Sequence, residues 1–265
     1  MIDSQRLLQE SKKLLKALEK DIRERLDESP ELDGQLKAEW EAARAANRTA
    51  GAYLDWREEN ITQSAVHWIL ACVFLRFLED NDFLARAYLT SADKEAREAA
   101  RDDYERYFRA NPNHSDLEYL LHAYREVSRL PGLKGLYDER HNPLFRLLLS
   151  GDGGIALLSF WKKVDPESGV LVHDFTDPSR ETRFLGDLYQ DLSESAKDRY
   201  ALLQTPQFVE EFILDRTLTP AIETFGYKEA RLIDPTCGSG HFLLGAFQRL
   251  FDLWAKKEPA RNLPD

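Results

Sequence analysis

The sequence RLIDPTCGSGHFLLGAF occupies residues 231–247 of this chain of 265 residues and decides how its C-terminal part folds. Residues 231–233 form a short apolar run that is typical of a buried strand. Residues 234–240 have the composition of a turn, and apolar side chains then recur at the helical period over residues 241–257. Strand, glycine turn and helix together are the first half of a nucleotide-binding α/β unit, and the second half does not follow in this chain.

The glycines of this turn indicate a ligand site. Gly238 and Gly240 can adopt a positive φ and let a ligand approach the backbone closely. Successive N–H groups at a helix N-terminus form a concavity for anions, so the turn suits a phosphate or a carboxylate. It is not a Walker A motif, because no Lys follows the glycines, and it lacks the third glycine of a dinucleotide-binding loop. The alternative is a plain strand-to-helix turn, but Asp-Pro, two glycines and an aromatic residue together are too specific for it.

A second motif lies one helix before the glycine turn. Pro206 is placed to begin a helix over residues 207–224, where its missing N–H costs nothing, and Thr205 falls at the N-cap. Alone, this pair is an ordinary helix start, but its position before the glycine turn favours a role in the same site. Cys237, inside the turn, is not interpreted as a nucleophile, because no His or acidic partner stands beside it in sequence.

Composition limits the classes of function. Hydrophobic residues make up 43% of the chain, which is enough for a core, and the net charge is -11. A chain this acidic does not attract DNA with its whole surface, so any contact with DNA requires a local patch or another part of the molecule. Its two cysteines form no disulfide framework and no zinc spacing, which indicates a reducing cytoplasm and no metal site.

The rest of the chain is expected to be mainly helical up to about residue 180. The apolar run at residues 65–78 is shorter than the ~20 residues that span a bilayer, so it predicts a buried helix and no membrane segment. No signal peptide is apparent at the N-terminus. We therefore expect a helical domain over residues 1–180 and an incomplete second domain over residues 181–265. Helices are predicted at residues 2–27, 35–58, 61–80, 92–109, 116–129, 143–149, 155–163 and 184–192, with a possible break at Gly51, a turn at 151–154 and a linker at 164–180. Pro30, after Ser29, is expected to end the first of these helices.

These motifs resemble those of a known family. The sequence from Asp234 to Phe242, DPTCGSGHF, is similar to motif I of the N6-adenine DNA methyltransferases, D-P-x-C-G-S-G-x-F. The segment from Tyr200 to Pro206 resembles their upstream motif, in which Thr-Pro precedes a helix over the cofactor. This motif order is that of type I modification subunits and fused restriction–modification enzymes. The helical region, with its sequence FLED at residues 77–80, further resembles the BREX-type methyltransferases of phage defence.

The resemblance implies S-adenosylmethionine (SAM) as cofactor and the beginning of a Rossmann-like, SAM-dependent methyltransferase domain. In the family the backbone of the turn faces the methionine part of SAM, the Thr-Pro motif contacts the same end, and the aromatic residue packs beneath the loop. Family members usually carry an aromatic residue where this chain has Gln204. The cofactor-binding residues implied are Gln204, Thr205, Pro206, Asp234, Pro235, Cys237, Gly238, Ser239, Gly240 and Phe242.

The catalytic motif of this family is not found in the chain. Adenine methyltransferases need Asn or Asp, then Pro-Pro and an aromatic residue, to hold the amino group of a flipped adenine. The nearest match, NPLF at residues 142–145, lacks the second Pro and is interpreted as a helix start. No catalytic residue is therefore assigned. We expect a truncated form of a larger enzyme that is inactive alone, reaches DNA through regions missing from this chain, and works with defence-system partner proteins.

A second hypothesis belongs to another class of protein: a helical interaction module that keeps the glycine turn as a relic. Because a lone strand leaves its backbone groups unpaired, we expect residues 227–265 to be poorly ordered in the isolated chain. His67 and His122 are expected to be packed on helices among apolar neighbours, and His241 to be a spacer. The first helix carries lysines that could contact a DNA backbone, but solvation is the favoured interpretation: Lys12, Lys13, Lys16 and Lys20.

Overall fold

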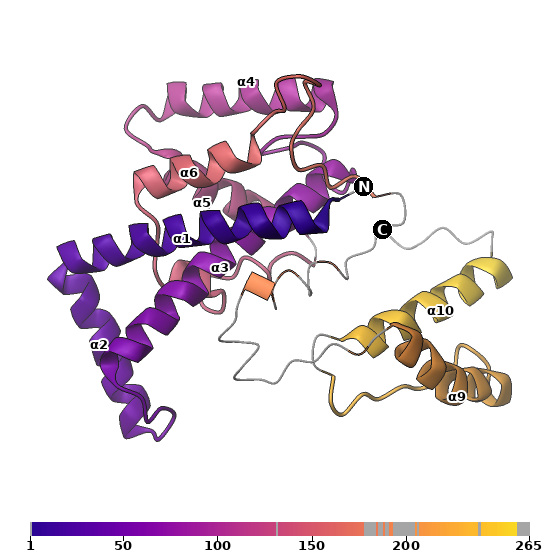
Figure 1. Ribbon diagram of the computed structural model, residues 1–265. Helices are drawn as coiled ribbons and strands as arrows, with labels where there is room; N and C mark the ends of the chain where they lie inside the picture. The colour runs from indigo at the N-terminus through magenta and orange to yellow at the C-terminus, as the bar shows by residue number, and fades with distance from the viewer. Residues whose placement is uncertain are drawn as a thin grey trace. The chain divides into compact units, whose positions relative to one another are not determined.

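The computed structural model describes residues 2–130, 132–177, 184, 188, 191–192, 205, 207–237 and 240–258. Contacts divide the chain into two compact units, Met1–Ser195 and Ala196–Asp265, called here the first and the second unit. Helices are the regular elements of the described residues in both units (Figure 1), so the mainly helical class is confirmed. The predicted boundary between residues 180 and 181 stays a prediction.

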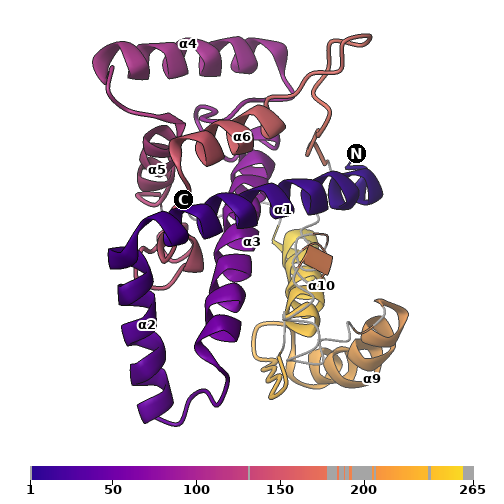
Figure 2. The ribbon, with the colours of Figure 1, turned by 60° about the vertical axis from the view of Figure 1, so that its left-hand side comes forward.

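The first unit is a set of helices around α3. In Figures 1 and 2, α1 crosses α3 in both views, and α6 lies beside α5 and α1. Its elements are α1 (Ser4–Glu28), α2 (Pro30–Ala45), α3 (Tyr53–Asp80), α4 (Lys94–Ala110), α5 (Asp116–Val127), the short 3-10 helix η1 (Pro143–Phe145) and α6 (Gly151–Trp161).

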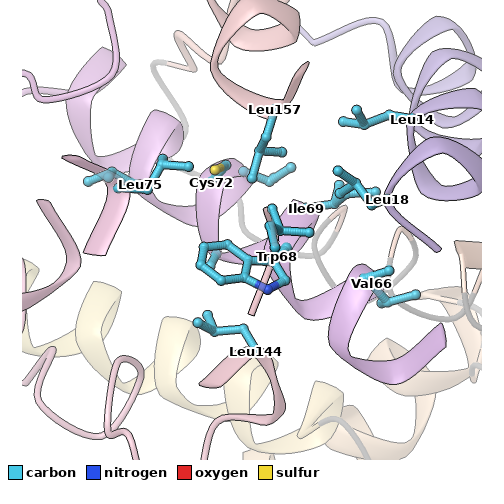
Figure 3. Close-up of a cluster of buried hydrophobic side chains, with 14 of the residues drawn as sticks. Leu14, Leu18, Val66, Trp68, Ile69, Cys72, Leu75, Leu144 and Leu157 are labelled. Atoms are coloured by element: carbon cyan, nitrogen blue, oxygen red, sulfur yellow. The ribbon is translucent and has the colours of Figure 1, made fainter. Parts of the chain in front are cut away.

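The helix α3 forms the centre of the core. Trp68 is fully buried and lies among Leu18 of α1, Leu144 of η1 and Leu157 of α6 (Figure 3). Its indole N–H donates to the carbonyl of Leu147 at 3.2 Å, so the polar atom of this side chain is satisfied inside the core. By length and composition α3 could also cross a membrane, but 72% of its most apolar window is buried within the protein. This agrees with the prediction of a buried helix.

The boundaries of α2 and α3 correct the prediction. The possible break predicted at Gly51 is confirmed, since residues 46–52 separate α2 from α3, with Asn47 at a φ of 55°. The predicted separation between residues 58 and 61 is wrong, because α3 runs without a break from Tyr53 to Asp80. Pro30 was expected only to end the first helix. It also begins α2, where it occupies the first turn and the Ser29 hydroxyl accepts from the Leu32 N–H at 3.4 Å. Proline is tolerated there because the first helical N–H groups have no partner in the helix.

The glycines at residues 151–154 also correct the prediction, since they form the first turn of α6 and not a loop. The Ser150 hydroxyl caps this helix by accepting from the Gly153 N–H at 3.0 Å. Gly154 brings α6 against α5, because a Cβ atom there would lie 2.6 Å from the backbone nitrogen of Leu117. Glycine serves here for close packing of two helices, which a composition-based turn prediction cannot detect.

Two helix starts agree with the sequence. Ser115 begins α5 with a capping box, in which the Glu118 carboxylate accepts from the Ser115 N–H at 2.7 Å. The Asn142 side chain accepts from the Leu144 N–H at 3.0 Å and begins η1. The interpretation of residues 142–145 as a helix start is therefore confirmed. The predicted helix at residues 184–192 lies mostly outside the described residues.

The second unit consists of α9 (Gln207–Phe225) and α10 (His241–Lys257), which lie side by side (Figures 1 and 2). Leu214 and Leu218 of α9 form a small cluster with Ala246 of α10. The Arg249 guanidinium donates to the Asp215 carboxylate at 2.5 Å and holds the two helices together. Both helices agree with the predicted ranges, and the expectation that residues 227–265 are poorly ordered in the isolated chain stays a prediction.

The predicted strand at Leu232 and Ile233 does not form. These residues have no regular structure, and the Ile233 side chain is 86% exposed. A strand needs neighbours that pair with its N–H and carbonyl groups, and the described residues of the second unit supply none. The α/β part of the expected fold is therefore not observed among the residues that the structure describes.

Candidate cofactor-binding site

The glycine turn leads directly into α10. Gly240 has a φ of 83°, which favours glycine, and its N–H donates to the Cys237 carbonyl at 2.7 Å. The first hydrogen bond of α10 then runs from the Leu244 N–H to the Gly240 carbonyl at 2.9 Å. The positive φ expected of Gly240 is confirmed, whereas Gly238 and Ser239 lie outside the described residues.

This geometry gives the turn the chemistry of an anion site. N–H groups that precede the first hydrogen bond of a helix point out of its N-terminal end, where the helix dipole places partial positive charge. Gly240 ends the turn at that point, directly before the first N–H groups of α10. A carboxylate or a phosphate fits there.

Asp234 adds an acceptor to the same loop. One carboxylate oxygen, Oδ1, accepts from the Thr236 N–H at 3.1 Å and from the Thr236 hydroxyl at 3.4 Å. The other oxygen, Oδ2, is buried and has no hydrogen-bond partner among the residues that the structure describes. Buried polar atoms in proteins are nearly always hydrogen-bonded, so this oxygen is available to accept from a cationic or N–H group of a ligand.

The remaining site residues are only partly placed by the structure. Phe242 is half-buried and packs against the cluster of Leu214, Leu218 and Ala246. Pro235 and Cys237 are exposed, and Thr205 is half-buried before the start of α9. Gln204 and Pro206 lie outside the described residues, so the contact of the Thr-Pro motif with the turn stays a prediction.

One pair of residues that no sequence motif indicates lies beside the candidate site. Glu210 of α9 is only 1% exposed, and its Oε1 would lie 2.0 Å from a Cβ atom built on Gly245 of α10. Gly245 therefore makes room for this carboxylate one turn after the glycine loop. An isolated glycine inside an apolar helical pattern was the available signal, because such a residue usually has a packing reason.

The other candidates have structural roles. His67 is packed on α3 with its Nδ1 2.8 Å from the Gln63 carbonyl, and burial lowers its pKa. Burial raises the pKa of the Cys72 thiol to about 12, so Cys72 stays uncharged in the core. Among the described residues, no group of three or more His, Cys, Asp or Glu side chains could hold a metal ion.

Comparison with known proteins agrees with the resemblance that the sequence D-P-x-C-G-S-G indicates. The chain is similar to the adenine-specific methyltransferase PglX of Streptomyces coelicolor, with 46% identity over 270 aligned residues. The expected resemblance to this family is therefore confirmed. The alignment covers 99% of this chain and 22% of that relative, so the chain spans about a fifth of the relative's length. No protein-family model and no solved structure matches the chain.

Proposed function

We propose that this chain provides the helical N-terminal unit and the beginning of the cofactor-binding domain of a larger DNA methyltransferase. That enzyme would transfer a methyl group from SAM to N6 of adenine in DNA, for host modification and phage defence. The similarity to an adenine-specific methyltransferase over nearly the whole chain carries this proposal. Because the chain spans about 22% of that relative, the activity is assigned to the longer protein.

The residues of the turn fit one end of SAM. SAM supplies a methyl group on a positively charged sulfur, and its methionine part carries a carboxylate and an ammonium group. The N-terminal end of α10 would hold the carboxylate, and the buried Oδ2 of Asp234 would accept from the ammonium group. Thr205 is assigned to the same end of the cofactor on the basis of the family motif.

The chemistry beyond cofactor binding requires residues that this chain does not contain. No Asn or Asp followed by Pro-Pro and an aromatic residue occurs in the sequence. We therefore propose that the chain alone does not methylate adenine and that DNA contacts come chiefly from other regions. Defence-system partner proteins and a cytoplasmic location complete the proposal.

The alternative is a helical interaction module, and one observation favours it. Large apolar side chains of the second unit are exposed, including Phe208 (73%), Phe212 (58%) and Phe247 (63%). Exposed apolar surface of this kind marks an interface. In the first proposal, the sheet of the complete domain covers these side chains, whereas in the second a separate protein does.

Cofactor binding by the turn separates the two proposals. An NMR titration of the ¹⁵N-labelled chain with SAM is expected to shift the amide signals of residues 234–240. Gly240→Asp should weaken this binding at least tenfold, about 1.4 kcal/mol, because the side chain strains a φ of 83° and places negative charge at the carboxylate site.

Gly226→Asp is the matched control, since Gly226 has a φ of 82° in the same unit but lies outside the turn. Its SAM affinity should stay close to that of the parent chain. A parent chain whose turn signals do not respond to SAM would favour the interaction module.

A further inference from the structure

A pocket opens on the surface of the first unit between α4, α5 and the segment that connects α3 to α4. Its volume is about 250 Å³, and nothing in the methyltransferase motifs accounts for it. The residues that carry its chemistry are Arg86, Tyr88, Asp103, Arg106, Tyr107 and His122. The glycine turn belongs to the other unit, so this pocket is a separate site.

Aromatic rings form one wall of the pocket. The Tyr107 and His122 rings are stacked, with centroids 5.0 Å apart and an interplanar angle of 27°. Tyr119 meets Tyr107 edge-on at 5.1 Å, and its hydroxyl donates to the Tyr88 carbonyl at 2.7 Å. The Tyr107 hydroxyl lies 2.8 Å from Nδ1 of His114. These contacts fix the rings in place, so the wall is preorganised for a flat ligand.

Guanidinium groups also line the pocket. The Arg86 guanidinium lies 4.6 Å from the centroid of the Tyr88 ring, and the Arg86 side chain is 50% exposed. Arg106 is 72% exposed and pairs with Asp103, which also lies 3.6 Å from Arg86. Two guanidinium groups thus share one carboxylate. The pocket is locally positive on a chain with a net charge of -11.

The environment of His122 is also cationic. Burial lowers the pKa of His122, and the nearby guanidinium groups of Arg86, Arg125 and Arg129 lower it further, whereas Glu126 opposes them. The imidazole is therefore neutral at neutral pH, and it presents an uncharged aromatic face and both a donor and an acceptor nitrogen.

We infer that this pocket binds a single nucleotide, with the base against the Tyr107–His122 wall and the phosphate on Arg86 and Arg106. Aromatic faces bind nucleobases by stacking, and the guanidinium fork matches a phosphate group. A volume of about 250 Å³ lies close to the lower end of the ~300–1,000 Å³ of common ligand sites, so the pocket is of a size for one small ligand and is too small for a duplex. The nucleotide can be free or an unpaired residue of a nucleic-acid strand, because both present the same base and phosphate.

The test uses AMP and a fluorescein-labelled oligodeoxyadenylate of eight nucleotides with the full chain. Calorimetry is expected to show saturable binding of AMP. The double variant Arg86→Gln/Arg106→Gln should weaken it about tenfold or more. The control is Arg101→Gln/Arg109→Gln, which removes the same charge from exposed positions of α4 that do not line the pocket. Its affinity should stay within about twofold of the parent.

SAM also contains adenosine, so AMP could bind at the proposed SAM site. Each titration is therefore repeated with the Gly240→Asp chain. The pocket is supported by AMP binding that persists in Gly240→Asp and is lost in the Arg86→Gln/Arg106→Gln variant. This binding should also shift the His122 ring signals in NMR. The result does not depend on whether the turn binds SAM. If AMP displaces the bound oligonucleotide, the ligand is a residue of a strand; if only AMP binds, it is a free nucleotide. No saturable binding, equal weakening by both double variants, or loss only in Gly240→Asp would overturn the inference.

Discussion

At the scale of residues, two buried carboxylates order the first unit. Glu79 accepts from the backbone N–H groups of Tyr88 at 2.6 Å and Leu89 at 2.8 Å, which fixes the segment after α3. Asp80 accepts from the N–H groups of Ala92 at 2.9 Å and Phe175 at 3.0 Å. Two adjacent side chains thereby bind segments that lie far apart in sequence.

Arg76 compensates both charges from the preceding turn of α3. Its guanidinium lies 3.4 Å from the Glu79 carboxylate and 2.5 Å from that of Asp80, and all three side chains are fully buried. It also donates to the Thr90 carbonyl. The sequence FLED was noted only as a family resemblance, and the structure gives it a physical role.

Arg76→Met is expected to reduce the free energy of unfolding by about 3–5 kcal/mol, because it leaves two carboxylates buried without their cation. Urea unfolding followed by circular dichroism measures this. The control Arg109→Gln removes an exposed pair with Glu105 and should change little. Equal stability of the Met variant would show that Arg76 does not compensate these charges.

In the same variant, the pH dependence that Glu79 gives to stability should extend to higher pH than in the parent. Burial raises the pKa of Glu79 from 4.5 to about 7, and Arg76 limits that rise. Without Arg76 the folded-state pKa rises further, so the folded chain holds a proton that the unfolded chain has released. Stability then falls as pH increases from about 4.5 through 7 and above. The deficit of Arg76→Met relative to the parent should therefore be larger at pH 8 than at pH 6. A deficit that is the same at both pH values would contradict this account.

At the scale of elements, glycine position controls how closely helices pack. Gly154 lets α6 approach the backbone of α5, because a Cβ atom there would lie 2.6 Å from the nitrogen of Leu117. Backbone cannot move aside as a flexible side chain can. Gly34 of α2 has no atom within 4 Å of its Cβ position, so it has no such packing role.

Opposite effects are expected from two Gly→Ala substitutions. Gly154→Ala should destabilise the chain by about 1–3 kcal/mol through overpacking, although alanine is the better helix former. Gly34→Ala should stabilise it by up to about 1 kcal/mol, because alanine loses less conformational entropy. Urea midpoints of the two variants measure both effects. A Gly154→Ala chain that is as stable as the parent, or more stable, would mean that close packing does not require glycine at this position.

At the scale of the whole molecule, the two units differ in how much core they contain. The first unit has a continuous buried cluster around Trp68, Ile69 and Leu157. The buried cluster of the second unit contains Leu214, Leu218 and Ala246, with Ile222 and Phe242 partly buried against it. A small unit buries a limited fraction of its surface and is correspondingly marginal.

The units should therefore behave differently when expressed separately. Residues 1–195 are expected to unfold cooperatively in urea, at nearly the midpoint of the full chain. Residues 196–265 should show no cooperative transition, because a cluster this small cannot offset the conformational entropy of its chain. Circular dichroism of both fragments measures this. A cooperative second unit, or an unfolded first unit, would contradict it.

Much of the helical architecture could be predicted from the sequence. Helical periodicity located α1, α4, α5, α9 and α10 to within a few residues, because it reports which face of a helix is buried. The predicted role of Pro30 was incomplete and the turn at residues 151–154 was wrong, since proline and glycine have two structural uses that depend on neighbouring helices. The strand at Leu232 failed because pairing partners, and not local composition, decide whether a strand forms.

For the candidate site, the sequence alone determined the turn, the positive φ of Gly240 and the family resemblance, because these depend on a few contiguous residues. Only the tertiary structure revealed Glu210 against Gly245, the buried oxygen of Asp234, and the joining of Arg86, Tyr107 and His122 in one pocket. Local conformation follows from neighbouring residues in the chain. Contacts between distant residues depend on how helices pack, and the sequence does not specify that packing position by position.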